Sequence, residues 1–294
     1  MVCRESPKPN SPKALQSRYT KFCFGHNSEL LSNLLRAKLS QNLARLVPRL
    51  KAELEYITAS EFPECKEWTG VKFQSFALRA VARMSGRAFV GPDLNRLEDW
   101  MDTSINFAIH VFVAVVKLQL IPEWLRPVGQ YFVSEIGKIN RDLTRAENML
   151  RPIVVERLRG LDTASSEKPP DDFVQWLLEA LPEHEKSDVR TLAHIQLILA
   201  AASIHTTTNL VTECMFDLAA HPDVQQLLRE EASHVLERDN GWDKKESMSK
   251  LKKMDSFIKE VQRTNGNIST SGFCFRRREL TMRSILHPQG DEAH

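Results

Sequence analysis

The chain has 294 residues, of which 42% are hydrophobic, and its 40 basic and 38 acidic side chains leave a formal net charge of +2. This content supports a sizeable folded core, and the near balance of charge excludes the strong positive field with which many proteins attract nucleic acid. Only 11 glycines occur, while Leu, Ala, Glu, Arg and Lys are abundant, so the composition favours helices over strands.

The five cysteines are scattered along the chain, and no two of them form a C-x-x-C pair. An odd number without close spacing argues against a disulfide framework and against a zinc cluster. We therefore expect a reducing compartment, cytoplasmic for the chain as given, and no metal-ligating residues. The cysteines are Cys3, Cys23, Cys65, Cys214 and Cys274.

The N-terminal segment is polar and contains prolines without the apolar stretch of a secretory signal, so residues 1–29 are predicted to form a disordered arm. A helical core is predicted over residues 30–264. Its first part, residues 30–57, repeats leucines at spacings of three and four, which is typical of an amphipathic helix. Pro48 interrupts this pattern and predicts a division into two short helices.

Three further helical runs are predicted over residues 71–89, 94–120 and 128–161, with Gly86 and the following Gly-Pro pair ending the first of them. The most apolar stretch of the chain, residues 105–116, is shorter than the ~20 residues that a helix needs to cross a bilayer. We therefore expect no transmembrane segment.

After a linker over residues 162–171, a short helix and then one long central helix are predicted. The central helix spans about residues 188–220 without glycine or proline, and its ~33 residues correspond to a length on the order of 50 Å. Asp188 is its expected N-cap, and the pair His221-Pro222 ends it.

Beyond the central helix, one helix is predicted to begin at Pro222 and another to cover about residues 255–264, with Asp255 as its cap. Residues 265–294 are predicted to form an irregular tail. The predicted fold class is therefore mainly α, with one long central helix and few or no strands.

The centre of the long helix is unexpectedly polar, since residues 199–209 read LAAASIHTTTN. Serine, threonine and asparagine side chains compete for backbone carbonyls inside a helix. Two interpretations remain open at this point. The cluster either opens or bends the helix, as is frequent at functional sites, or each hydroxyl bonds the carbonyl one turn back.

Several segments together resemble one family. The sequence AASIHTT is followed by HPDVQQLLREEA and by the E-x-x-R tetrad at 260–263, and the phrases LSQNLARLVPRL, FPECKEWTGVKF, VARMSGRAFVG and LIPEWLRPV precede them in order. Over about residues 30–280 the chain is similar to the cytochrome P-450 family of haem-thiolate monooxygenases. The A-x-x-H-T-T form resembles fungal members that act on secondary metabolites.

The resemblance implies a catalytic segment on the central helix, where the family pattern [A/G]-G-x-[D/E]-T-[T/S] corresponds to residues from Ala202 to Thr207. In the family the threonine matched by Thr206 takes part in proton delivery to oxygen, together with the preceding acid. Here His205 replaces that acid and can still pass protons near neutral pH. Ser203 replaces the usual glycine, and with Ala202 and Thr207 it is expected to line the substrate pocket.

The resemblance also implies structural and cofactor contacts. Glu260 and Arg263 share a helix face, and they form either a solvated surface pair or the family's buried E-x-x-R pair beneath the haem. Arg36 corresponds to a basic residue that contacts a haem propionate, although Ser32 stands near the position of the family's partnering tryptophan. An exposed helix arginine is the other reading of Arg36.

One motif of the family is absent from the sequence. The thiolate loop F-x-x-G-x-[R/H]-x-C-x-G does not occur, and neither Cys274, in SGFCFRRREL, nor Cys214, two turns after Thr206, fits its place. Thiolate ligation is what drives cleavage of the O–O bond in this family. The chain is therefore expected to be truncated at both ends, to bind no haem and to be inactive as given.

By resemblance, the function is linked to oxidation of a hydrophobic secondary metabolite of the terpenoid or polyketide class. The family's partners would be that small molecule and a reductase, with no nucleic acid, and full-length members are usually anchored at the endoplasmic reticulum. The alternative that the residues leave open is a non-catalytic helical binding or dimerisation protein.

Overall fold

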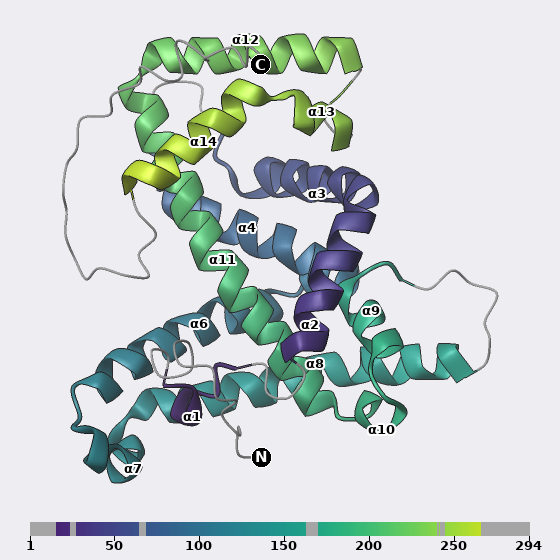
Figure 1. The fold of residues 1–294 in the computed structure, drawn as a ribbon, viewed down its shortest axis with the longest axis vertical. Coiled ribbons are helices and arrows are strands. Elements are labelled where there is room, and N and C mark those ends of the chain that lie inside the picture. The colour runs from purple at the N-terminus through teal and green to yellow at the C-terminus, as the bar shows by residue number, and fades with distance from the viewer. Residues whose placement is uncertain are drawn as a thin grey trace, which may run out of the picture. The chain divides into compact units, whose positions relative to one another are not determined.

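A computed structural model of the chain describes residues 16–23, 28–64, 69–162, 170–239, 241 and 245–265 (Figure 1). These residues form helices joined by turns and loops, and no strand occurs among them. The mainly α fold class is thus confirmed. The chain separates into two compact units, Met1–Thr206 and Thr207–His294, and the predicted division into arm, core and tail stays a prediction.

The first described residues are attached to later helices. Residues Ser17–Thr20 form α1, with Ser17 and Thr20 buried. Lys21 donates from its Nζ to Asn140 at 2.7 Å, and His194 Nε2 donates to the Lys21 carbonyl at 2.6 Å. Burial lowers the pKa of His194, which keeps the imidazole neutral in this contact.

The predicted interruption at Pro48 is wrong. Helix α2 (Ser28–Leu34) passes into a π-helical segment, η2 (Leu35–Leu39), and α3 (Ser40–Glu61) then continues through Pro48. Proline frees the carbonyl of Ala44 from its helical bond. Both residues are exposed, so water can satisfy that carbonyl and the helix persists.

Gly86 does not end the next helix, which ends at Phe89 beside the Gly-Pro pair at 91 and 92. Helix α4 spans Phe73–Phe89 and contains Gly86, which is buried where the Asn95 side chain approaches. Helix α5 (Gly91–Asn95) begins at Gly91, whose positive φ of 83° makes the turn between the two helices. Helix α6 (Glu98–Gln119) follows directly.

Helices α6 and α8 (Ser134–Asp162) are linked by polar side-chain contacts along their length. Lys117 donates to Glu135 at 2.8 Å, which lowers the pKa of that carboxyl group. His110 Nδ1 lies 2.6 Å from Asp142 Oδ2. Three short helical segments connect α6 to α8: η3 (Glu123–Leu125), α7 (Arg126–Gly129) and η4 (Gln130–Phe132).

Side-chain caps position the start of two later helices. Asp172 accepts from the backbone N–H of Gln175 at 3.0 Å and caps α9 (Phe173–Ala180). After α10 (Glu183–Lys186), Asp188 accepts from the backbone N–H of Thr191 at 3.1 Å, as the sequence predicts. Helix α11 then spans Val189–Ala220, which confirms the long central helix. Most of the predicted linker, residues 163–169, lies outside the described residues.

The first half of α11 is buried on nearly every side. A helix that is apolar all round requires neighbours on all its faces. Ala200 and Ile204 pack with Ala82 of α4 and with Met101 and Ile105 of α6. The main core cluster takes a further set from α11: Leu192, Ala193, Ile195, Leu197, Ile198, Leu199 and Ala201.

The second unit has a small core of its own. The C-terminal half of α11, α12 (Pro222–Asp239), α13 (Lys245–Lys250) and α14 (Lys252–Asn265) belong to it. Val224 and Leu228 of α12 pack against Phe257 and Val261 of α14. Pro222 occupies the first position of α12, as predicted from the sequence.

Asp255 is not the cap of α14, contrary to the sequence-based expectation. The helix begins at Lys252, so Asp255 lies inside it. The carboxylate of Glu231, on α12, accepts the backbone N–H groups of Lys253 and Met254 at 2.8 and 2.9 Å. A side chain from another helix thus takes the place of a local cap.

Helix α6 is longer than the apolar run that the sequence marked. Its 22 residues are long and apolar enough to cross a membrane, by length and composition alone. The expectation of no transmembrane segment stays a prediction. However, 56% of its most apolar window is buried within the fold, and the core helices of soluble proteins pass the same test, so the helix is weak evidence for a span.

The two helical glycines Gly86 and Gly137 provide a matched test of packing. A Cβ atom at Gly86 would overlap Oδ1 of Asn95, a residue that is only 2% exposed, so that side chain would have to shift. Nothing lies within 4 Å of a Cβ at Gly137. We expect Gly86→Ala to lower the free energy of unfolding by about 1–3 kcal/mol, and Gly137→Ala to raise it by about 0.5–1 kcal/mol.

Denaturant titration of both variants measures these changes. Equal effects of the two substitutions would contradict the close approach of α5 to α4.

Candidate functional site

The hydroxyl groups of the polar segment bond the backbone of their own helix. Ser203 Oγ donates to the carbonyl of Ala200 at 3.2 Å, and Thr206 Oγ1 donates to that of Ala202 at 2.7 Å. Helix α11 remains α-helical throughout this segment. This geometry agrees with the second interpretation from the sequence, in which the hydroxyl groups donate to backbone carbonyls about one turn back.

One face of this segment is open. Ala202 and Thr206 lie four residues apart, so they share a face of the helix, and both are exposed among the described residues. Ile204, on another face, is 1% exposed. Ser203 is partly buried, and Thr207, the first residue of the second unit, is exposed. The Thr206 hydroxyl has given its hydrogen to Ala202, so its oxygen can still accept one from a ligand.

His205 is tied to the neighbouring helix. Its Nε2 lies 3.2 Å from the carbonyl oxygen of Ile105, on α6. Since a carbonyl only accepts, Nε2 must carry the hydrogen, and in the neutral ring Nδ1 is then the acceptor. The side chain is half-buried. This contact occupies one ring nitrogen in holding α6 to α11 and leaves Nδ1 for any proton transfer.

The E-x-x-R pair of α14 is formed, but it lies at the surface of the described residues. Arg263 donates through Nε to Glu260 at 2.8 Å and through a second nitrogen to the other carboxylate oxygen. These bonds lower the pKa of Glu260. The Arg263 side chain is 67% exposed.

Arg36 lies in the π-helical segment η2 and is exposed. Single π turns inside α-helices are often found at functional sites. The sequence around it, LLRAKL, contains no glycine or proline that would mark such an irregular turn. The structure places Arg36 in no described ion pair or hydrogen bond with a residue of the polar segment on α11.

The described cysteines do not fit an iron-ligating thiolate. Cys23 and Cys214 are partly buried. Burial, with the nearby charge of Asp217, raises the pKa of Cys214 to about 11, so this thiol stays protonated near neutral pH. No group of three or more His, Cys, Asp or Glu side chains suited to a metal occurs in the described residues. The remaining cysteines lie outside those residues: Cys3, Cys65 and Cys274.

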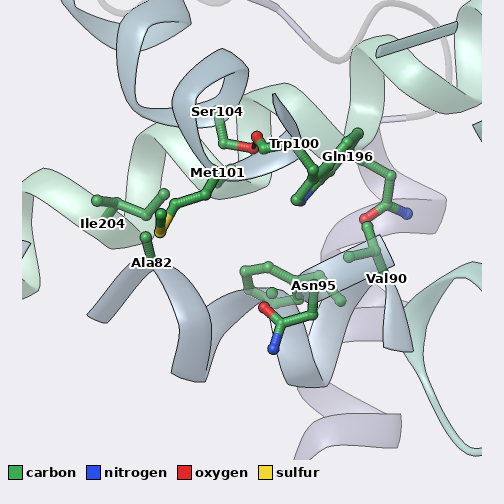
Figure 2. A pocket seen from close by; sticks show the side chains of 11 residues that line it. Ala82, Val90, Asn95, Trp100, Met101, Ser104, Gln196 and Ile204 are labelled. Carbon is green, nitrogen blue, oxygen red and sulfur yellow. Dashed lines mark hydrogen bonds between the residues drawn. The ribbon is translucent and has the colours of Figure 1, made fainter. Parts of the chain in front are cut away.

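A buried cavity lies where α4, α5, α6 and α11 meet, and sequence reasoning missed it (Figure 2). Its volume is about 10 Å³. Gln196 and Asn95 line it with side-chain amides that are 1% and 2% exposed. Both amide atoms of Gln196, and Nδ2 of Asn95, have no hydrogen-bond partner among the described residues. A glutamine within the apolar run AHIQLILAA is the sequence signal that could have pointed to it.

Comparison with known proteins agrees with this helical architecture. The cytochrome P450 family model matches residues 26–270. The chain belongs to the cytochrome P450 family.

The chain is also similar in sequence to curated cytochrome P450 monooxygenases from fungi. The chain is 35% identical over 257 residues to cytochrome P450 monooxygenase AN1598 of Emericella nidulans, covering 86% of this chain and 47% of that protein. It is 36% identical over 256 residues to cytochrome P450 monooxygenase olcJ of Penicillium canescens, covering 85% and 48%. The chain thus spans about half the length of the curated relatives it matches.

A solved structure has the same fold. The retinoic acid-bound cyanobacterial CYP120A1 aligns with a TM-score of 0.55 at 18% identity, covering 86% of this chain and 51% of that one. The family resemblance read from the sequence is confirmed by these findings. They do not test the roles of Thr206, His205, Glu260, Arg263 and Arg36.

The reactivity of the Cys214 thiol tests whether this residue could serve as an iron-ligating thiolate. With its pKa raised from 9.0 to about 11, we expect about a hundredfold smaller thiolate fraction near neutral pH than in the unfolded chain. Alkylation by iodoacetamide, followed by mass spectrometry of the peptide that carries Cys214, should be slower in the folded chain by about this factor. Equal rates in the folded chain and in denaturant would show a reactive thiolate and would reopen the question of a ligand.

Proposed function

We propose that this chain supplies the oxygen-facing and substrate-facing helices of a monooxygenase that acts on a hydrophobic secondary metabolite of the terpenoid or polyketide class. The observation that carries the proposal is the open face at Ala202 and Thr206, in a helix that is otherwise buried. These two residues occupy the positions of the family's oxygen-handling pattern. The fungal monooxygenases among the relatives support the same reaction class.

The roles of the chain's own residues follow from their contacts. The Thr206 hydroxyl donates to Ala202 and keeps its oxygen for a hydrogen bond from a ligand hydroxyl. His205 holds α6 against this segment through Ile105 and offers Nδ1 to a proton. Ser203 and Thr207 flank the open face and would contact the apolar body of the ligand.

Haem in this family supplies the activation of oxygen, and a reductase supplies electrons. The described residues contain no thiol that fits the iron ligand, so we propose that the 294-residue chain on its own binds no thiolate-ligated haem and does not turn over. Glu260, Arg263 and Arg36 keep their family roles only as proposals. The same holds for cytoplasmic localisation of this chain and for membrane anchoring of its full-length relatives.

A non-catalytic binding or dimerisation protein is the alternative. The enclosed cavity between α4, α5, α6 and α11 has a volume of about 10 Å³, which is too small for a metabolite. A binding role would therefore have to use an exposed surface such as the face at Ala202 and Thr206. Self-association measured by analytical ultracentrifugation would favour the alternative.

Absorption spectroscopy tests the proposal about haem. We expect the purified chain, expressed with haem supplied, to lack the reduced, carbon monoxide-bound band that gives the family its name, because the family's thiolate loop does not occur in the sequence. The ferric chain and free haem in the same buffer are the references. A band of the family type would overturn the proposed inactivity.

Ligand binding tests the open face with a matched pair of variants. Thr206 and Thr144 are both exposed threonines that donate to the carbonyl four residues back, so valine removes the same group at each. With a monohydroxylated diterpene as probe, we expect Thr206→Val to weaken binding roughly 2- to 12-fold, the loss of one hydrogen bond. Thr144→Val should leave affinity unchanged.

Tryptophan fluorescence titration gives the dissociation constants of this series, and hydrogen exchange locates the contact. Protection of residues 202–206 by the probe supports the proposal. Binding without protection there, or equal effects of the two substitutions, would remove its basis.

A further inference from the structure

The cavity between α4, α5, α6 and α11 is lined by hydrogen-bonding groups that the described residues leave without partners. Gln196 carries one acceptor and two donor hydrogens on its amide, and neither amide atom has a partner. Asn95 leaves its Nδ2 unpaired as well. Leaving a buried donor or acceptor unsatisfied costs about 1–3 kcal/mol. Among the described residues nothing satisfies these groups, and a buried water molecule is the usual partner of such groups.

The opposite ends of the cavity differ in character. Figure 2 shows Gln196 and Asn95 on the side near Val90, with Ala82, Met101 and Ile204 on the other side. Ala82, Met101 and Ile204 belong to a buried apolar cluster. A polar partner is therefore confined to the end at Gln196 and Asn95.

The chemistry of the lining selects the partner. It must donate to Oε1 of Gln196 and accept from an amide nitrogen, which excludes a bare cation, because the N–H groups would face it. An anion is excluded because it would face Oε1. No charged side chain lines the cavity, so nothing there would balance a charge. The partner is neutral and is both a donor and an acceptor.

The size of the cavity narrows the choice to one molecule. Its volume of about 10 Å³ is that of a single water-sized probe, and a buried water needs about 10–15 Å³ and two to four polar partners. Ser104 adds a further acceptor, because its hydroxyl hydrogen is donated to the carbonyl of Trp100 at 2.8 Å.

We infer that this cavity is an internal hydration site in which one water molecule is bound by the amide of Gln196, on α11. Its role is independent of the proposed monooxygenase function, since the site would be hydrated in a non-catalytic protein as well.

Oxygen-17 magnetic relaxation dispersion of the full chain tests this inference, because it reports water molecules that stay bound longer than the protein takes to tumble. Gln196→Met keeps the length of the side chain and removes the amide. We expect the dispersion amplitude to fall by the contribution of one water. Met101→Leu, at the apolar end of the same cavity, is the matched control and should keep the amplitude of the unsubstituted chain.

An unchanged amplitude in Gln196→Met, or an equal fall in both variants, would overturn the inference. If Gln196→Met does not fold, a crystal structure of the unsubstituted chain decides the question. Density for one water within hydrogen-bond distance of the Gln196 amide supports the site, and an empty cavity overturns it.

Discussion

The burial of the first half of α11 is the constraint on which the first unit depends. Leu192, Leu197 and Ile204 are each about 1% exposed or less, and full burial of such side chains contributes roughly 1.5–3 kcal/mol apiece. A helix that is apolar all round gains this energy only when neighbours cover all its sides. Each polar side chain along it must then find a partner. His205 contacts the carbonyl of Ile105, while Gln196 has no partner among the residues that the structure describes.

The elements that the sequence predicts well are those set by local chemistry. The central helix follows from a long run without glycine or proline, and its cap at Asp188 follows from a side-chain acceptor placed just before a helix. The errors arise where distant residues decide. Exposure lets α3 continue through Pro48, and Glu231 of α12 moves the start of α14 ahead of Asp255. No local sequence pattern predicts the exposure of α3 at Pro48 or the contact of Glu231 with the start of α14.

The candidate site shows the same limit. Its location could be predicted, because hydroxyl-bearing residues inside an apolar helix stand out in the sequence. The sequence could not decide between an opened helix and hydroxyls bonded to the backbone, since both arrangements use the same residues. In the structure, the hydroxyls of Ser203 and Thr206 bond the backbone of their own helix. The cavity amides were missed for a different reason. Gln196 and Asn95 are about 100 residues apart and meet only through the packing of four helices.

The histidine at position 205 has a structural consequence that the family's acidic residue would not have. An ionised carboxylate only accepts hydrogen bonds, so at this position it would face the lone pairs of the Ile105 carbonyl and be repelled. The imidazole donates through Nε2 instead and closes a contact between α11 and α6. The family's carboxylate could stay free on α11, whereas the imidazole of His205 holds α6 in place. Any ligand that approaches the open face at Ala202 and Thr206 meets a segment that α6 helps to keep in place.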